Sequence, residues 1–315
     1  NATVSVGDGA TVRGDVNGAG LGNAIHIVNA DLATVNVGAG AFVFSTAQGW
    51  ADAVISITSD DGATINVGSG ALVSAWSYNG TTQLDLADAA SRIVINVDGA
   101  AGTINNYGTI VGLVGLTDFA DTFNNLSSDT WITVGENNFG GGSDVVNNTG
   151  VIVTAVQGGV AEQTSFVSLE SFVNGNPAGT SGGVLSSIDE TPGTLGRTAA
   201  RDVTTISGIF TSVANSAVGL DTYLGGPGST SDQLVIGGLD ASGAPLTGTT
   251  LSGTTYLLIH DVNPGAAAYN IAGIQLVEIE NGSAAGAGFA LDPRSSYYSP
   301  RFGGVLDKGL FIYDL

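Results

Sequence analysis

The stretch TINVGSGALV occupies residues 64–73, and the similar stretch TVNVGAGAFV occupies residues 34–43. The two start 30 residues apart, and threonine, asparagine, valine and glycine recur at the same places in both. A fixed internal period of this kind is typical of chains that stack one small structural unit on the next. The repeat therefore indicates the architecture of the chain before it indicates any chemistry.

The same spacing extends through the first hundred residues. The repeated piece reads VSVGDG from Val4, VNVGAG from Val35, INVGSG from Ile65 and INVDGA from Ile95. A second apolar piece covers residues 25–27, 55–57 and 84–86, and a third covers residues 11–12, 42–43, 72–73 and 103–104. Alternation of apolar and polar residues is the period of a strand with one buried face. Each repeat is therefore expected to hold three short strands.

Three strands per repeat predict an all-β chain folded as a parallel β-helix. Equivalent residues of successive coils would then lie about 4.8 Å apart, the spacing of neighbouring strands. The expected interior ladders are Val4, Val35, Ile65 and Ile95, and beside them Val6, Val37, Val67 and Val97, while Ser5, Asn36, Asn66 and Asn96 are expected to point outward. No stretch has the apolar spacing of a helix, and frequent glycine would weaken a long one.

From about residue 102 the repeats become shorter and less uniform. Pieces that combine an apolar residue with asparagine begin at Ile104, Phe123, Val146 and Phe172, at intervals of 19, 23 and 26 residues. Asparagine suits tight turns, and stacked asparagine side chains can bond to one another along a solenoid. Residues 176–202 are the least periodic part and are expected to be irregular, and strand-like pieces return from about residue 203.

The charge of the chain excludes one class of partner. Its 315 residues include 28 acidic and 7 basic side chains, a formal net charge of −21. A phosphate-binding surface needs clustered lysine and arginine, so nucleic acid is not expected as a partner. The absence of cysteine removes disulfides, cysteine–zinc sites and thiol nucleophiles. We expect no cofactor and no bound metal.

The last third of the chain carries three further motifs. They are GGPGSTSDQLVIGG from Gly225, SGTTYLLIHDVNPGAAAYNIAGIQLVEIENGS from Ser252, and the closing KGLFIYDL. Together they resemble the end of the passenger domain of bacterial autotransporters, the proteins of type V secretion. The matching features are Asp232, Leu234 and Ile236, then Gly273 to Val277, then Phe311, Tyr313 and Leu315. Phe311 stands where members of that family often have tryptophan.

This resemblance implies a right-handed parallel β-helix with two parts. Residues 1–220 would form the stem, and residues 221–315 would form a C-terminal autochaperone module that folds first and templates the coils before it. The chain would be a non-enzymatic passenger at the surface of a Gram-negative bacterium, serving as an adhesin, a stalk or a self-associating fibre. Its partners would be a host or neighbouring cell surface, copies of itself, and the outer-membrane β-barrel translocator, which is expected to follow Leu315 outside this chain.

A glycan-binding or glycan-cleaving β-helix is the rival interpretation. Two converging carboxylates in a groove, or an exposed pair of tryptophans, would favour it. Trp50 and Trp76 stand in successive repeats and are candidates for such a pair, with Trp131 as a further aromatic. The acids at 60–61 and at 118 and 121 are expected to be ordinary solvated turn residues.

Arg13, Gly14 and Asp15 form an RGD tripeptide, which in some adhesive proteins engages integrins. Such a role needs an exposed turn that presents both charges, and an ordinary turn between strands explains the same residues. His26 and His260 are the only histidines, and both are expected to lie on the surface. A histidine-based metal site or catalytic triad is therefore not expected.

Overall fold

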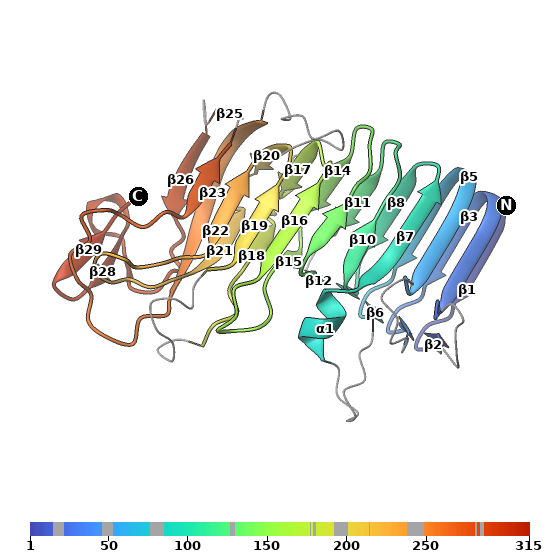
Figure 1. Cartoon of the computed structure of the whole chain (residues 1–315), viewed down its shortest axis with the longest axis horizontal. Coiled ribbons are helices and arrows are strands. Elements are labelled where there is room, and N and C mark those ends of the chain that lie inside the picture. Colours follow the sequence, from blue (N-terminus) through green and yellow to red (C-terminus); the bar gives the residue numbers. More distant parts are fainter. Residues whose placement is uncertain are drawn as a thin grey trace.

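The computed structural model describes residues 1–14, 22–45, 53–75, 85–126, 130–176, 178, 181–191, 201–213, 215–237, 249–280, 282–283 and 287–315. Within these residues the chain is all-β, and 26 strands join through parallel pairings into one sheet. The strands lie across the long axis of the molecule and follow one another along it from the N-terminal to the C-terminal end (Figure 1). This arrangement is compatible with the expected β-helix.

The parallel pairings fall into three columns, each named here after its first complete strand. The β1 column contains β1 (Ala2–Val6), the C-terminal halves of β3 (Ile25–Val37) and β5 (Ile55–Val67), β8 (Gly102–Asn106), β11 (Thr122–Asn125), β14 (Val145–Asn148), β17 (Ser171–Asn174) and β20 (Ile209–Ser212). The β7 column contains the N-terminal halves of β3 and β5, β7 (Ile93–Gly99), β10 (Leu113–Gly115), β13 (Glu136–Asn138), β16 (Gln163–Val167), β19 (Val203–Ile206), β22 (Gln233–Ile236) and β24 (Val277–Ile279).

The β2 column contains β2 (Thr11–Gly14), β4 (Phe42–Ser45), β6 (Leu72–Ala75), β9 (Thr109–Val111), β12 (Thr130–Ile132), β15 (Val151–Val153), β18 (Val184–Ser186), β21 (Ala217–Thr222), β23 (Thr249–Asp261) and β26 (Ala287–Leu291). The short β25 (Gly282–Ser283) pairs with the start of β23. The chain visits all three columns once in each repeat, which agrees with the three strands predicted from the sequence.

The first three repeats stack in the predicted register, and the fourth does not. Val4, Val35 and Ile65 pair as expected, but the next partner of Ile65 is Ile104. Ile95 belongs instead to the β7 column, where it pairs with Ile55. The predicted placement of Ile95 in the first ladder was therefore wrong.

The neighbouring positions shift with it. Val97 pairs with Ile57 and Asn96 with Ser56, so neither joins the ladder predicted for it. The piece at residues 103–104 lies in the β1 column beside residues 64–65, not in the β2 column. Asn106 and Asn105 take the places that had been assigned to Val97 and Asn96.

An inserted helix explains the shift. Residues 25 and 55 pair across 30 residues, but residues 55 and 95 pair across 40. The extra length includes α1 (Leu86–Ala90), whose N-cap Asp85 accepts a hydrogen bond from the Asp88 amide at 3.3 Å. Ala89 and Ala90 pack on Val111 in a small apolar cluster outside the main core. The strand predicted at residues 84–86 was wrong at residues 85 and 86, because capping and burial of the alanines favour a helix there.

The interior changes from aliphatic to aromatic along the stack. Phe123 stacks on Trp131 with ring centroids 4.2 Å apart, and Trp131 meets the edge of Phe166 at 5.5 Å. Phe172 stacks on Phe210 at 5.5 Å. All five rings are fully buried. The larger rings fill the core where the repeats become irregular.

A small antiparallel sheet lies at the C-terminal end of the stack (Figure 1). It contains β27 (Tyr298–Ser299), β28 (Val305–Lys308) and β29 (Phe311–Tyr313), with the 3-10 turn η1 (Arg301–Gly303) between the first two. In the described part of the chain, no helix is long and apolar enough to cross a membrane.

Candidate functional site

An inner asparagine ladder runs through the middle of the stack. Its members are Asn106, Asn125, Asn148 and Asn174, all fully buried at the C-terminal ends of β1-column strands. Each of the first three donates from Nδ2 to the Oδ1 atom of the next, at 2.8, 2.9 and 2.9 Å. The second Nδ2 hydrogen of Asn125 reaches the Val151 carbonyl at 3.1 Å, and that of Asn148 reaches the Val184 carbonyl at 3.0 Å. The ladder therefore ties the β1 column to the β2 column.

An outer asparagine ladder stands beside it on the surface. Its members are Asn36, Asn66, Asn105, Asn124 and Asn147, each half-buried and one residue before an inner position. Here each Nδ2 donates to the preceding member, toward the N-terminus, at 2.8, 2.9, 2.9 and 2.9 Å. The inner ladder donates in the opposite direction. The predicted amide stacking is confirmed, and it occurs on both faces of the same strands.

A ladder of acids begins the same strands at their other end, and of these Asp121 and Asp144 are fully buried and Glu170 is half-buried. Asp121, Asp144 and Glu170 each precede a β1-column strand. The Asp121 amide donates to Asp144 and the Asp144 amide donates to Glu170, both at 2.7 Å. Burial raises the pKa of Asp144 to about 7, and the charges of Glu170 and Asp121 act in the same direction. Each carboxyl group thus receives a backbone N–H from the repeat before it.

A larger group of acids, here called the acidic cluster, lies near the C-terminal end. It contains Glu162, Asp189, Glu190, Asp202, Asp221 and Asp232. The Glu162 amide donates to Asp202 at 2.6 Å, the Asp202 amide to Asp232 at 3.0 Å, and the Asp221 amide to the other oxygen of Asp232 at 2.7 Å. Asp232 therefore joins two columns with one carboxyl group.

The acidic cluster can hold protons at neutral pH. Burial raises the pKa of Asp232 to about 9 and that of Asp202 to about 8. Burial also raises the pKa of Asp189 to about 7, with the charges of Glu190 and Asp221 adding to it. His260 Nδ1 bonds to Asp221, and this bond raises the pKa of His260. Among the described residues no group of three or more acidic and histidine side chains could hold a metal ion.

Several predicted surface residues are instead structural. Asp121 is fully buried, so its assignment as a solvated turn acid was wrong, whereas Asp60, Asp61 and Asp118 are exposed as expected. Trp131 lies in the core and donates from Nε1 to the Gly112 carbonyl at 3.0 Å, so it is no surface aromatic.

The two histidines differ. His26 is exposed as predicted. His260 is not an ordinary surface histidine, because it pairs with a fully buried aspartate.

The candidate binding residues are only partly described. Arg13 is exposed and Gly14 is buried at the end of β2. Asp15, Trp50 and Trp76 lie outside the described residues, so the RGD tripeptide and the tryptophan pair stay predictions. The sequence does carry a signal for the acid ladders. An acid stands directly before the strand in DTF, DVV and ESF at 121, 144 and 170, and in EQT, DVT and DQL at 162, 202 and 232.

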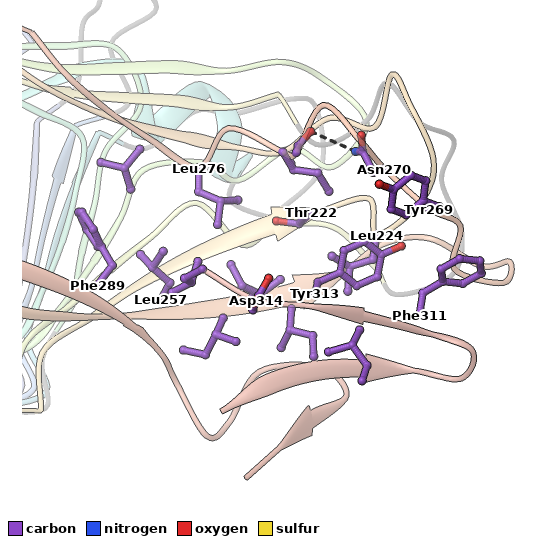
Figure 2. A pocket seen from close by; sticks show the side chains of 18 of the residues that line it. Thr222, Leu224, Leu257, Tyr269, Asn270, Leu276, Phe289, Phe311, Tyr313 and Asp314 are labelled. Atoms are coloured by element: carbon purple, nitrogen blue, oxygen red, sulfur yellow. Dashed lines mark hydrogen bonds between the residues drawn. The ribbon is translucent and has the colours of Figure 1, made fainter. Parts of the chain in front are cut away.

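A cavity of about 740 Å³ lies between the last parallel strands and the C-terminal segment. Leu224, Leu257 and Leu276 line it together with Phe311 and Tyr313 (Figure 2). The Tyr313 hydroxyl donates to the Ala268 carbonyl at 2.9 Å. Lys308 is buried against Asp261 and donates to the Asn263 carbonyl at 3.0 Å. These contacts hold the small antiparallel sheet on the end of the stack.

The chain was compared with models of protein families, with curated proteins and with solved structures. No family model matches it, and neither does any curated protein or solved structure.

Proposed function

We propose that this chain is the right-handed β-helical passenger of a Gram-negative autotransporter. It would act without catalysis at the cell surface, as an adhesin, a stalk or a self-associating fibre. Right-handed crossovers are the rule for parallel strands in one sheet, which supports the handedness. Its C-terminal module would template the folding of the stem after secretion.

The observation that carries this proposal is the packing of the C-terminal motifs on one another. Gly273, Leu276 and Val277 of the second motif line the same cavity as Phe311, Tyr313 and Leu315 of the third. In the first motif Leu234 and Ile236 are fully buried, and Asp232 ties together the amides of two columns. The residues that carry the resemblance are thus the ones that close this end of the stack.

A closed end suits a folding seed. Stacked repeats bury their apolar faces only against a neighbour, so a first coil is costly to form. Pairings between distant residues also fold slowly. The buried Lys308–Asp261 pair spans 47 residues and draws the end of the chain onto β23. A seed held together in this way would offer the next strand a preformed edge.

The surface of the stem suits lateral contact. The outer asparagine ladder gives a regular polar face, and the net charge of −21 makes copies repel one another. Salt screens such repulsion, over about 10 Å at 0.1 M ionic strength. Adhesion between cells that display the chain is therefore expected to increase with salt.

Deletion at the two ends tests the templating role. Removing residues 225–315 should leave the stem without β-sheet signal in circular dichroism and sensitive to protease. Removing residues 1–24, the first repeat, is the matched control and should leave the remainder folded. A stem that keeps its full signal and resistance without residues 225–315 would refute the proposal.

A further inference from the structure

The outer face of the β1 column carries a regular array of threonine and asparagine. Four successive strands present a threonine and, two residues later, an asparagine, and these eight residues are here called the polar array: Thr34, Asn36, Thr64, Asn66, Thr103, Asn105, Thr122 and Asn124. The register joins threonine to threonine and asparagine to asparagine at every step. Thr3 and Ser5 extend both rows by one strand at the N-terminal end.

The array repeats in two directions with fixed distances. Along a row, neighbours are separated by the interstrand spacing of about 4.8 Å. Within a strand, the threonine and the asparagine are two residues apart, or about 6.6 Å at the usual rise of a parallel strand. The result is a regular lattice of hydroxyl and amide groups along the strands.

The side chains of the array are held in place. Each asparagine is bonded to the next in the outer ladder, at 2.8 to 2.9 Å. Threonine is branched at Cβ and has few side-chain conformations. A preordered surface loses little conformational entropy when it binds. The array is therefore suited to a ligand that is itself rigid and periodic.

The charge of the array restricts the ligand further. None of its eight residues ionises, although the whole chain has a net charge of −21. A basic partner would find its complement among the exposed acids, such as Asp60 and Asp61, and not on this face. The complement of the array is an uncharged lattice that both donates and accepts hydrogen bonds at similar spacings. The oxygen atoms at the surface of hexagonal ice form such a lattice.

We propose that the polar array binds ice. Threonine hydroxyls and asparagine amides would replace water molecules of the surface layer, and the threonine methyl groups would fill the space between them. This inference does not depend on the way in which the chain is exported, although it uses the same outer asparagine ladder to which we assign lateral contact between copies.

Partitioning into growing ice tests the proposal with the purified chain. The wild-type chain should be enriched in the ice fraction and should slow ice recrystallisation. Thr64→Tyr places a large ring in the middle of the array and should reduce the enrichment by about tenfold, which corresponds to roughly 1.4 kcal/mol of binding free energy. Thr205→Tyr is the matched control, since Thr205 is a half-buried outward residue of β19 in the β7 column. It should behave as the wild type does.

A second variant and a check of folding exclude misfolding as the cause of a loss of ice binding. Thr103→Lys adds a charge to the array and should also abolish enrichment, and circular dichroism should show both variants to be folded. Exclusion of the wild-type chain from ice would overturn the proposal. Equal enrichment of Thr64→Tyr and Thr205→Tyr would overturn it too, since binding would then use another face. The proposal would also be overturned if Thr64→Tyr altered sedimentation of the chain, which reports association between copies, but left its partitioning into ice unchanged.

Discussion

The turn that connects each β1-column strand to the next β2-column strand is stabilised differently in the early and late repeats. In the first repeats the inward residue before this turn is valine, at Val6, Val37 and Val67, and glycines make the turn. The backbone there bonds to itself, as when the Ala41 amide donates to the Gly38 carbonyl at 3.2 Å. In the fourth to seventh repeats the same inward position is asparagine, and in β20 it is Ser212. The amides of Asn125 and Asn148 bond carbonyls in the β2-column strand of the following repeat.

This difference shows that one position can be apolar or polar in a single core. Asn106 follows Val67 in the same row, and both are fully buried. The valines need no partner, whereas each asparagine relies on the repeats before and after it. Uniform repeats of about 30 residues tolerate the first solution. In the later repeats the asparagine amides add side-chain bonds between the columns that valine side chains cannot make.

The early and late repeats also differ in their buried acids, and the largest effect that we expect is the pH dependence of stability that these acids cause. The buried acids with raised pKa values lie in the later repeats, and the folded chain holds their protons more tightly than the unfolded chain, where the ordinary value is 3.8. Above about pH 4, folding therefore takes up protons, and the free energy of unfolding falls as pH rises. The contribution of these groups is fully present below about pH 4. It is lost as pH rises through about 7, 8 and 9 for Asp144, Asp202 and Asp232.

Thermal unfolding at several pH values measures this dependence. Each proton held only by the folded chain changes the free energy of unfolding by about 1.4 kcal/mol per pH unit. Asp232→Asn should make the dependence shallower above neutral pH, because the amide does not titrate. The exposed Asp60→Asn serves as the control and should leave the slope unchanged. A melting temperature that rises from pH 5 to pH 9 in the wild-type chain contradicts the prediction.

Breaking the inner ladder should have the next largest effect. Asn125→Val removes one hydrogen bond each from Asn106 Nδ2, Asn148 Oδ1 and the Val151 carbonyl. A buried polar group without a partner costs about 1–3 kcal/mol, so the loss of stability should be about 4 kcal/mol. Urea unfolding measures it. A loss below about 1 kcal/mol would mean that the ladder is not needed for stability.

Replacing a valine of the same row by asparagine should reduce stability less beside the inner ladder, at Val67, than between two other valines, at Val37. Val67→Asn places the new amide beside Asn106, whose Oδ1 already accepts from the Gly108 amide and has a second lone pair. Val37→Asn has only valines on both sides. We expect a loss of about 1 kcal/mol at position 67 and about 3 kcal/mol at position 37. Equal losses of stability for the two variants in urea unfolding would show that Asn106 does not provide a hydrogen-bond partner for an amide at position 67.

Breaking the outer ladder should give a small effect, similar to that of Val67→Asn. Asn124→Val removes bonds to Asn105 and Asn147 at a half-exposed position. Water can replace those bonds, so the expected loss is about 1 kcal/mol. The comparison with Asn125→Val is made on adjacent residues of one strand, and it isolates the role of burial. Similar losses for the two variants would contradict it.

The sequence determined the strand-forming pieces, their period and which side chains point inward. Val4, Val35 and Ile65 could be aligned because apolar alternation is a local property, and amide stacking followed from the repeated asparagine pairs. The acids before the strands were also readable, although burial of Asp121 and Asp232 could not be inferred from a turn-like neighbourhood.

Only the tertiary structure decided which repeat meets which. INVDGA at Ile95 has the same local pattern as INVGSG at Ile65, and nothing within the piece tells the two columns apart. The helix inserted before Ile95 moves that piece to the β7 column and leaves Ile104 as the partner of Ile65. Pairing between strands depends on the length of chain between them and on the burial of both faces. Local periodicity contains information on neither of these. The strand pattern of INVDGA could therefore be predicted correctly while the column of that strand was predicted wrongly.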